Sequence, residues 1–199
     1  MGKFKIAKVY IEHVVDDSAD TSCLGHYTDS PKEVAEACGY AIVREYGKFV
    51  VDIDEDTEKI HLNGNEYRYF IPAQHVPHDP KNWDHVSEED KNKCIAEHGS
   101  LKETDEYYAM MDYERMERLE DGDWCYIGIV AMAEIVGESD VIQTIRSGGV
   151  YGIESDSDKE YLIEVEQQEL IALSGELIDL GIEEDEIDEA IENKEYENS

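Results

Sequence analysis

The residues with the clearest chemical meaning are the acids near the end of the chain. Between Asp158 and Glu197 the sequence has 16 Asp and Glu residues and only two basic ones, Lys159 and Lys194. In a helix, the rise of about 1.5 Å per residue would space these carboxylates about 4 Å apart along the axis. One strand of B-DNA carries a phosphate about every 3.4 Å. The segment could therefore present a charge density close to that of a nucleic acid.

Nine of these acids are the ones that we expect to contact a basic partner protein, because the Leu side of the segment must face the core and direct them outward. They are Glu160, Glu164, Glu183, Glu184, Asp185, Glu186, Asp188, Glu189 and Glu192. Two other interpretations of the same charge remain open. The acids could form a solvated face that only keeps the protein in solution, or they could be an adaptation to high salt.

A second set of residues has the chemistry of metal ligands. Four histidines and one cysteine fall within 24 residues, namely His75, His78, His85, Cys94 and His98. Cys94 and His98 are four residues apart and would share one face of a helix. Zinc is bound by three or four such ligands, but the paired CxxC or HxxxH spacing of a zinc finger is missing. The alternatives are a zinc site, which would make the protein a metal-dependent enzyme, and a solvated loop without a cofactor.

Two runs of alternating carboxylates could gather a hard cation such as Ca²⁺ or Mg²⁺. The first, at residues 52–56, lacks the Gly and Glu that an EF-hand loop needs, because Thr57 and Asn63 stand there. The second, at residues 154–158, precedes a predicted helix, and Asp156 or Ser157 is suited to cap it. No GxSxG, P-loop, dinucleotide-binding or HExxH motif occurs. We therefore assign no catalytic residue, and an enzyme is disfavoured.

Composition limits the partners. The chain has 199 residues, 41% of them hydrophobic, and a formal net charge of −33. This hydrophobic fraction is sufficient for a core of ordinary size. So strong a negative charge, however, repels phosphate backbones and anionic membrane surfaces. Direct binding to nucleic acid or to a membrane is therefore not expected. No apolar run reaches the length of a membrane helix. The four cysteines are scattered along the chain, a pattern typical of reduced thiols rather than of a disulfide framework. We therefore expect a cytoplasmic protein.

The hydrophobic pattern predicts the elements that position these groups. Alternating β-branched and aromatic residues predict strands at 3–14, 40–46, 48–53, 58–62, 66–71, 124–136 and 141–145. Capping residues and helical periodicity predict helices at 31–38, 87–98, 104–120, 158–180 and 183–193. We expect one α+β domain over 1–199, with a single, largely antiparallel sheet, helices packed on one face, and an acidic helical segment at 158–197.

Part of the sequence resembles known proteins. The stretches GDWCYIGI at 122–129 and QTIRSGGVYGIESDSD at 143–158 resemble a group of small acidic proteins of bacteriophages and other mobile elements. The group brings no assured activity and no functional residues. What the resemblance implies is a context, in which a protein of this size and charge acts against host defence.

Charge and context together give the functional hypothesis. We expect a phage-encoded acidic binding protein, an inhibitor of the DNA-mimic, anti-restriction or anti-CRISPR type. It would block the nucleic-acid-binding surface of a host defence or nucleic-acid enzyme, so its partner is a basic nucleic-acid-binding host protein. The alternatives are the metal-dependent enzyme and an acidic scaffold protein. The sequence leaves the oligomeric state open.

Overall fold

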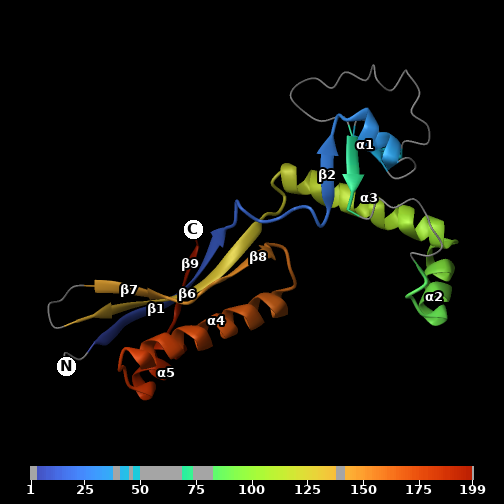
Figure 1. The fold of residues 1–199 in the computed structure, drawn as a ribbon. Coiled ribbons are helices and arrows are strands. Elements are labelled where there is room, and N and C mark those ends of the chain that lie inside the picture. The colour runs from blue at the N-terminus through green and yellow to red at the C-terminus, as the bar shows by residue number, and fades with distance from the viewer. Residues whose placement is uncertain are drawn as a thin grey trace. The chain divides into compact units, whose positions relative to one another are not determined.

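The computed structural model describes residues 4–37, 41–44, 47–49, 69–73, 83–137 and 142–198 (Figure 1). The chain divides into two compact units. The terminal unit consists of residues 1–19 and 124–199, so it joins the two ends of the chain, and the central unit consists of residues 20–123. By sequence the terminal unit has 24 acids and 6 bases, and the central unit 26 acids and 11 bases. The expectation of one domain over 1–199 stays a prediction.

A five-stranded sheet forms the terminal unit. Its strands are β1 (Lys5–Val15), β6 (Tyr126–Val136), β7 (Ile142–Arg146), β8 (Val150–Glu154) and β9 (Glu195–Asn198). The order is β7-β6-β1-β9, and β8 also pairs with β6. The long central pair β1–β6 is antiparallel, whereas β9 runs parallel to β1. The sheet is therefore mixed but mostly antiparallel, which confirms the α+β class.

Two helices, α4 (Lys159–Asp179) and α5 (Glu184–Glu192), pack against this sheet. Successive strand residues point to opposite faces, so Val9 and Ile11 of β1 face the helices while Tyr10 faces the other way. From α4, Leu173 and Leu177 enter the same core and are fully buried, as is Ile187 of α5. Figure 1 shows α4 running along one face of the sheet. The core thus holds both acidic helices in place.

The described residues of the central unit form a second sheet and three helices. The strands β2 (Gly25–Thr28), β3 (Ile42–Val43), β4 (Lys48–Phe49) and β5 (Tyr69–Pro72) pair in the order β2-β5-β3-β4. The helices are α1 (Pro31–Glu36), α2 (Glu88–His98) and α3 (Leu101–Glu120). Each begins after a serine whose hydroxyl accepts a backbone N–H three residues on, namely Ser30, Ser87 and Ser100.

An ion-pair network joins α3 to the strands of the central unit. The Arg44 guanidinium contacts the carboxylates of Glu117 at 2.7 Å and Glu120 at 2.6 Å and lies over the ring of Tyr27. The Tyr27 hydroxyl donates to the same Glu117 at 2.8 Å. Burial and this hydrogen bond raise the pKa of Tyr27, so its hydroxyl stays protonated. Tyr113 completes the cluster by donating to the Arg44 carbonyl.

The structure corrects the predicted sheet. The described strands within 3–14 and 124–145 belong to one sheet, whereas those within 40–53 and 66–71 belong to another, so the expectation of a single sheet is wrong. Residues 50–68 lie outside the described residues. The predicted helices are present, and α3 begins at Leu101 rather than 104 because Ser100 caps it. Strands β2, β8 and β9 were not predicted.

Candidate acidic binding surface

The nine acids expected to bind a partner lie on α4, on α5 and at the residue before α5. Eight of them have exposed side chains, and Glu186 alone is half-buried. The outward direction follows from the packing, because one side of α4 and Ile187 of α5 are used by the core. The structure therefore presents Glu160, Glu164, Glu183, Glu184, Asp185, Asp188, Glu189 and Glu192 to solvent; we call these eight the acidic surface.

The charge of the acidic surface is not neutralised within the described part of the chain. None of its eight carboxylates forms an ion pair there, whereas Lys8 is already paired with Glu195 at 3.1 Å. Lys194 lies near the ring of Tyr196 instead. Exposed carboxylates that are not neutralised attract basic surfaces and repel anionic ones. That the acids contact a partner remains a prediction.

Part of the charge on α5 also has a role in the helix itself. Glu184, Asp185 and Glu186 form its first turn, and its N-cap residue Glu183 makes no side-chain hydrogen bond. Carboxylates in the first turn stabilise a helix because the free N–H groups there carry a partial positive charge. Removing these acids would weaken the helix as well as the surface charge. Asp188, Glu189 and Glu192 lie beyond this turn and are better positions for substitution.

Glu186 differs from the other acids because its carboxylate already has a partner. Its Oε1 accepts the backbone N–H of Ile6 at 3.0 Å, where β1 passes α5. This bond satisfies a donor on the outer side of β1, since β9 pairs only with Tyr10–His13. Glu186 therefore links α5 to the sheet through this hydrogen bond, whether or not it also contacts a partner protein.

Two acids of α4 are buried, although the sequence predicts that most acids of this helix point outward. Glu166 accepts hydrogen bonds at both oxygens, with His13 Nε2 at 2.9 Å and the Tyr196 hydroxyl at 3.3 Å. Glu169 accepts the backbone N–H of Gly149 at 2.9 Å. Burial and the Glu166 carboxylate raise the pKa of Tyr196, which keeps its hydroxyl a donor. These two acids hold the fold together and are unavailable to a partner.

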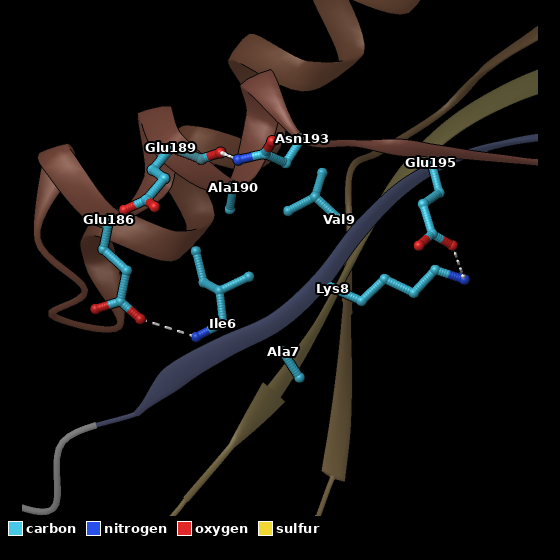
Figure 2. Close-up of a pocket in the computed structure, with 9 residues that line it drawn as sticks. All are labelled: Ile6, Ala7, Lys8, Val9, Glu186, Glu189, Ala190, Asn193 and Glu195. Atoms are coloured by element: carbon cyan, nitrogen blue, oxygen red, sulfur yellow. Dashed lines mark hydrogen bonds and ion pairs between the residues drawn. The ribbon is translucent and has the colours of Figure 1, made fainter.

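A pocket lies beside the acidic surface, between β1 and α5. It has a volume of about 360 Å³. Figure 2 shows its residues: Ile6, Ala7, Lys8 and Val9 from β1, Glu186, Glu189 and Ala190 from α5, and Asn193 and Glu195 beyond it. Sequence reasoning identified Glu186 and Glu189 for their charge. It missed the strand residues, because nothing in their pattern shows that α5 packs against them.

The predicted metal ligands are only partly described. His75 and His78 lie outside the described residues, and in the described part no three His, Cys, Asp or Glu side chains gather as metal ligands would. His98 stacks on Tyr107 of α3 with ring centroids 4.5 Å apart. His85 is exposed and Cys94 half-buried. The zinc site therefore stays a prediction, and the structure adds an aromatic contact for one of its proposed ligands.

The second carboxylate run caps a helix, as expected, but through a different residue. Asp158, rather than Asp156 or Ser157, is the N-cap of α4, and its carboxylate accepts the backbone N–H of Glu160 at 2.8 Å. Asp52, Asp54 and Asp56 of the first run lie outside the described residues.

One titratable group stands out that sequence reasoning did not identify. Burial raises the pKa of Asp112, on α3, to about 6. The acid is one of 50 in the chain, so its position in the sequence carries no signal of this environment.

The described helices include none with the length and apolar character needed to cross a membrane. Comparisons with protein-family models, with curated proteins and with solved structures give no match for this chain. Its function must therefore be argued from the acidic surface itself.

Proposed function

We propose that this protein is an acidic binding protein that occupies the nucleic-acid-binding surface of a basic enzyme. The observation that supports it is the acidic surface, whose eight exposed carboxylates have no basic partner among the described residues. Such a surface needs no catalytic group. It needs only a rigid support, which the packing of α4 and α5 on the sheet supplies.

The physical effect of these charges is on encounter and selectivity. Exposed ion pairs each contribute little affinity, but complementary charge raises the association rate and suppresses anionic competitors. A surface that binds nucleic acid is basic for the same reason, so it is the natural target. Nucleic acid and the acidic surface would then compete for one site, and the complex would weaken as salt rises.

The resemblance to acidic proteins of mobile elements suggests which enzyme is meant. We propose a phage-encoded inhibitor whose partner is a host defence enzyme of the restriction or CRISPR type. The proposed place of action is the host cytoplasm. This identity rests on the stretch at 122–158, while the binding mode rests on the acidic surface.

The test begins with capture of basic proteins from a bacterial lysate, followed by purification of the nucleic-acid enzyme retained. Displacement of a labelled oligonucleotide from that enzyme is then measured at several salt concentrations. The variant Glu164→Gln, Asp188→Asn, Glu192→Gln removes three charges from the acidic surface without touching the first turns of α4 and α5. We expect it to displace the oligonucleotide several-fold more weakly, mainly through a slower association rate.

A matched control removes three exposed charges from the central unit by Glu97→Gln, Glu114→Gln and Asp121→Asn. It has the same net charge as the first variant. Equal weakening in both variants would mean that total charge, and not the acidic surface, governs binding. Absence of displacement by the unaltered protein would refute the proposal. Truncation after Leu180 is a poor test, because it removes the buried Ile187 and the strand β9.

A further inference from the structure

The pocket between β1 and α5 combines an apolar floor with acidic ends. Ile6, Val9 and Ala190 lie together between the strand and the helix, and all three belong to or pack against the main core. Figure 2 shows their side chains in the space between β1 and α5. A volume of about 360 Å³ is at the lower end of the range for pockets that bind small ligands, which suits a single side chain better than a whole cofactor.

The two ends of the pocket differ in charge. At one end the Lys8 ammonium and the Glu195 carboxylate neutralise each other at 3.1 Å. At the other end lie Glu186 and Glu189 (Figure 2). Glu186 accepts only the neutral N–H of Ile6, and neither acid forms an ion pair within the described part of the chain. Among the described residues, this end therefore carries two carboxylates and no compensating cation.

We propose that this pocket takes the side chain of an arginine from the basic partner, an inference that rests on the proposed function and gives it a specific contact. The three-carbon stem of arginine would cover Ile6, Val9 and Ala190. Its guanidinium, planar and weakly hydrated with five N–H donors, would meet Glu189 and the second oxygen of Glu186. A phosphate or a carboxylate ligand is repelled by the same two acids.

The pocket is formed before any partner arrives. Burial of Ile187 and the bond from Ile6 to Glu186 fix the start of α5 on the sheet. The Asn193 side-chain amide donates to the carbonyl of Glu189 at 2.8 Å and fixes its end. Binding to a preformed site loses less entropy than binding that must order a loop. An arginine here would thus be an anchor at the border of the acidic surface.

The test uses the full chain labelled with ¹⁵N and titrated with N-acetyl-arginine amide at low salt. We expect saturable shifts of the amide signals of Ile6, Val9 and Ala190. N-acetyl-citrulline amide keeps the stem but has no charge, and it should give at least about tenfold weaker binding. Equal binding of the two probes, or shifts spread evenly over all acidic helices, would overturn the proposal.

Two variants of equal charge locate the effect. Glu189→Gln should weaken binding of the arginine probe about tenfold, whereas Glu176→Gln, an exposed acid of α4 away from the pocket, should leave it unchanged. Equal effects of the two substitutions would also overturn it. If Glu189→Gln abolished binding of the arginine probe but left oligonucleotide displacement intact, only the arginine anchor would be refuted. Arginine binding without displacement of any nucleic acid would refute the proposed function alone.

Discussion

His13 and Glu166, 153 residues apart in sequence, meet with Nε2 and Oε1 at 2.9 Å. Glu166 is only 7% exposed, and its other oxygen accepts the hydroxyl of Tyr196. One carboxylate of α4 therefore holds both β1 and the last strand of the sheet. We expect Glu166→Ala to lower the free energy of unfolding by about 1.5–3 kcal/mol, since it removes two hydrogen bonds to a buried carboxylate. Urea unfolding measures this.

The control for this substitution is Glu176→Ala, which removes an exposed acid from the same helix. Its effect should stay within about 0.5 kcal/mol. Tyr196→Phe, which deletes one of the two hydrogen bonds, should fall between them. If Glu166→Ala and Glu176→Ala were equally mild, the contacts of Glu166 would not stabilise the fold.

Asp112 makes stability depend on pH in a direction opposite to that of a salt-bridged acid. Its pKa of about 6 in the folded protein lies above the ordinary 3.8, and the cause is burial. The folded state therefore binds the proton more tightly, so stability falls as pH rises from about 4 to 6. Asp112→Asn imitates the protonated form. We expect it to stabilise the protein at pH 7.5 by about 1 kcal/mol, allowing for partial solvation, and to have a much smaller effect at pH 4, where the folded carboxyl is already protonated.

Thermal unfolding at several pH values tests this prediction. Glu114→Gln, an exposed acid on the same helix, serves as the control and should give a difference that hardly varies with pH. A stabilisation by Asp112→Asn that persisted unchanged at pH 4 would contradict the proposed cause.

Gly128 of β6 is required by its neighbour on β8. A methyl group at this position would overlap the ring of Tyr151. We expect Gly128→Ala to lower the free energy of unfolding by about 1–3 kcal/mol, as overpacking commonly does. In a Tyr151→Ala background the same substitution should cost much less, and a double-mutant cycle measures the coupling.

Gly148→Ala, where the added methyl meets nothing within 4 Å, is the control. Additive effects of Gly128→Ala and Tyr151→Ala would show that the ring is not the obstacle.

Local pattern predicted most elements but not how they assemble. The Leu spacing of 158–180 and the alternation of 3–14 predicted α4 and β1, since both arise from neighbours in sequence. Strand β9 could not be predicted in this way, because EYEN has no apolar alternation and is held by pairing with Tyr10–His13. The division into two sheets was not predicted for the same reason. Strand pairing depends on long-range contacts, which the periodicity of the sequence does not encode.

The acidic site shows the same limit. The amphipathic pattern of α4 and α5 predicted that their acids point outward. The same pattern cannot distinguish an exposed acid from a buried one. Glu166 and Glu169 are buried because His13, Tyr196 and Gly149 supply donors from distant strands. No spacing rule within one helix contains that information, so the burial of these acids and the pocket beside Glu189 emerge only from the fold.

The net charge of −33 predicts that salt stabilises the folded protein. The terminal and central units have net charges of −18 and −15, so self-repulsion acts in both, and any separate unfolding transitions should shift together. The screening length falls from about 30 Å at 0.01 M salt to about 8 Å at 0.15 M. A stabilisation of about 1 kcal/mol over this range should raise the melting temperature by about 2–4 °C if the chain unfolds in one transition, and by about 4–8 °C if each unit unfolds by itself, with little change at higher salt. Calorimetry in NaCl measures the melting temperature of each transition.

Two outcomes would contradict this prediction. A melting temperature that kept rising in proportion to salt up to 1 M would indicate exclusion of salt from the surface instead of screening. Melting temperatures that stayed flat below 0.15 M would show that the carboxylates do not repel one another enough to affect folding.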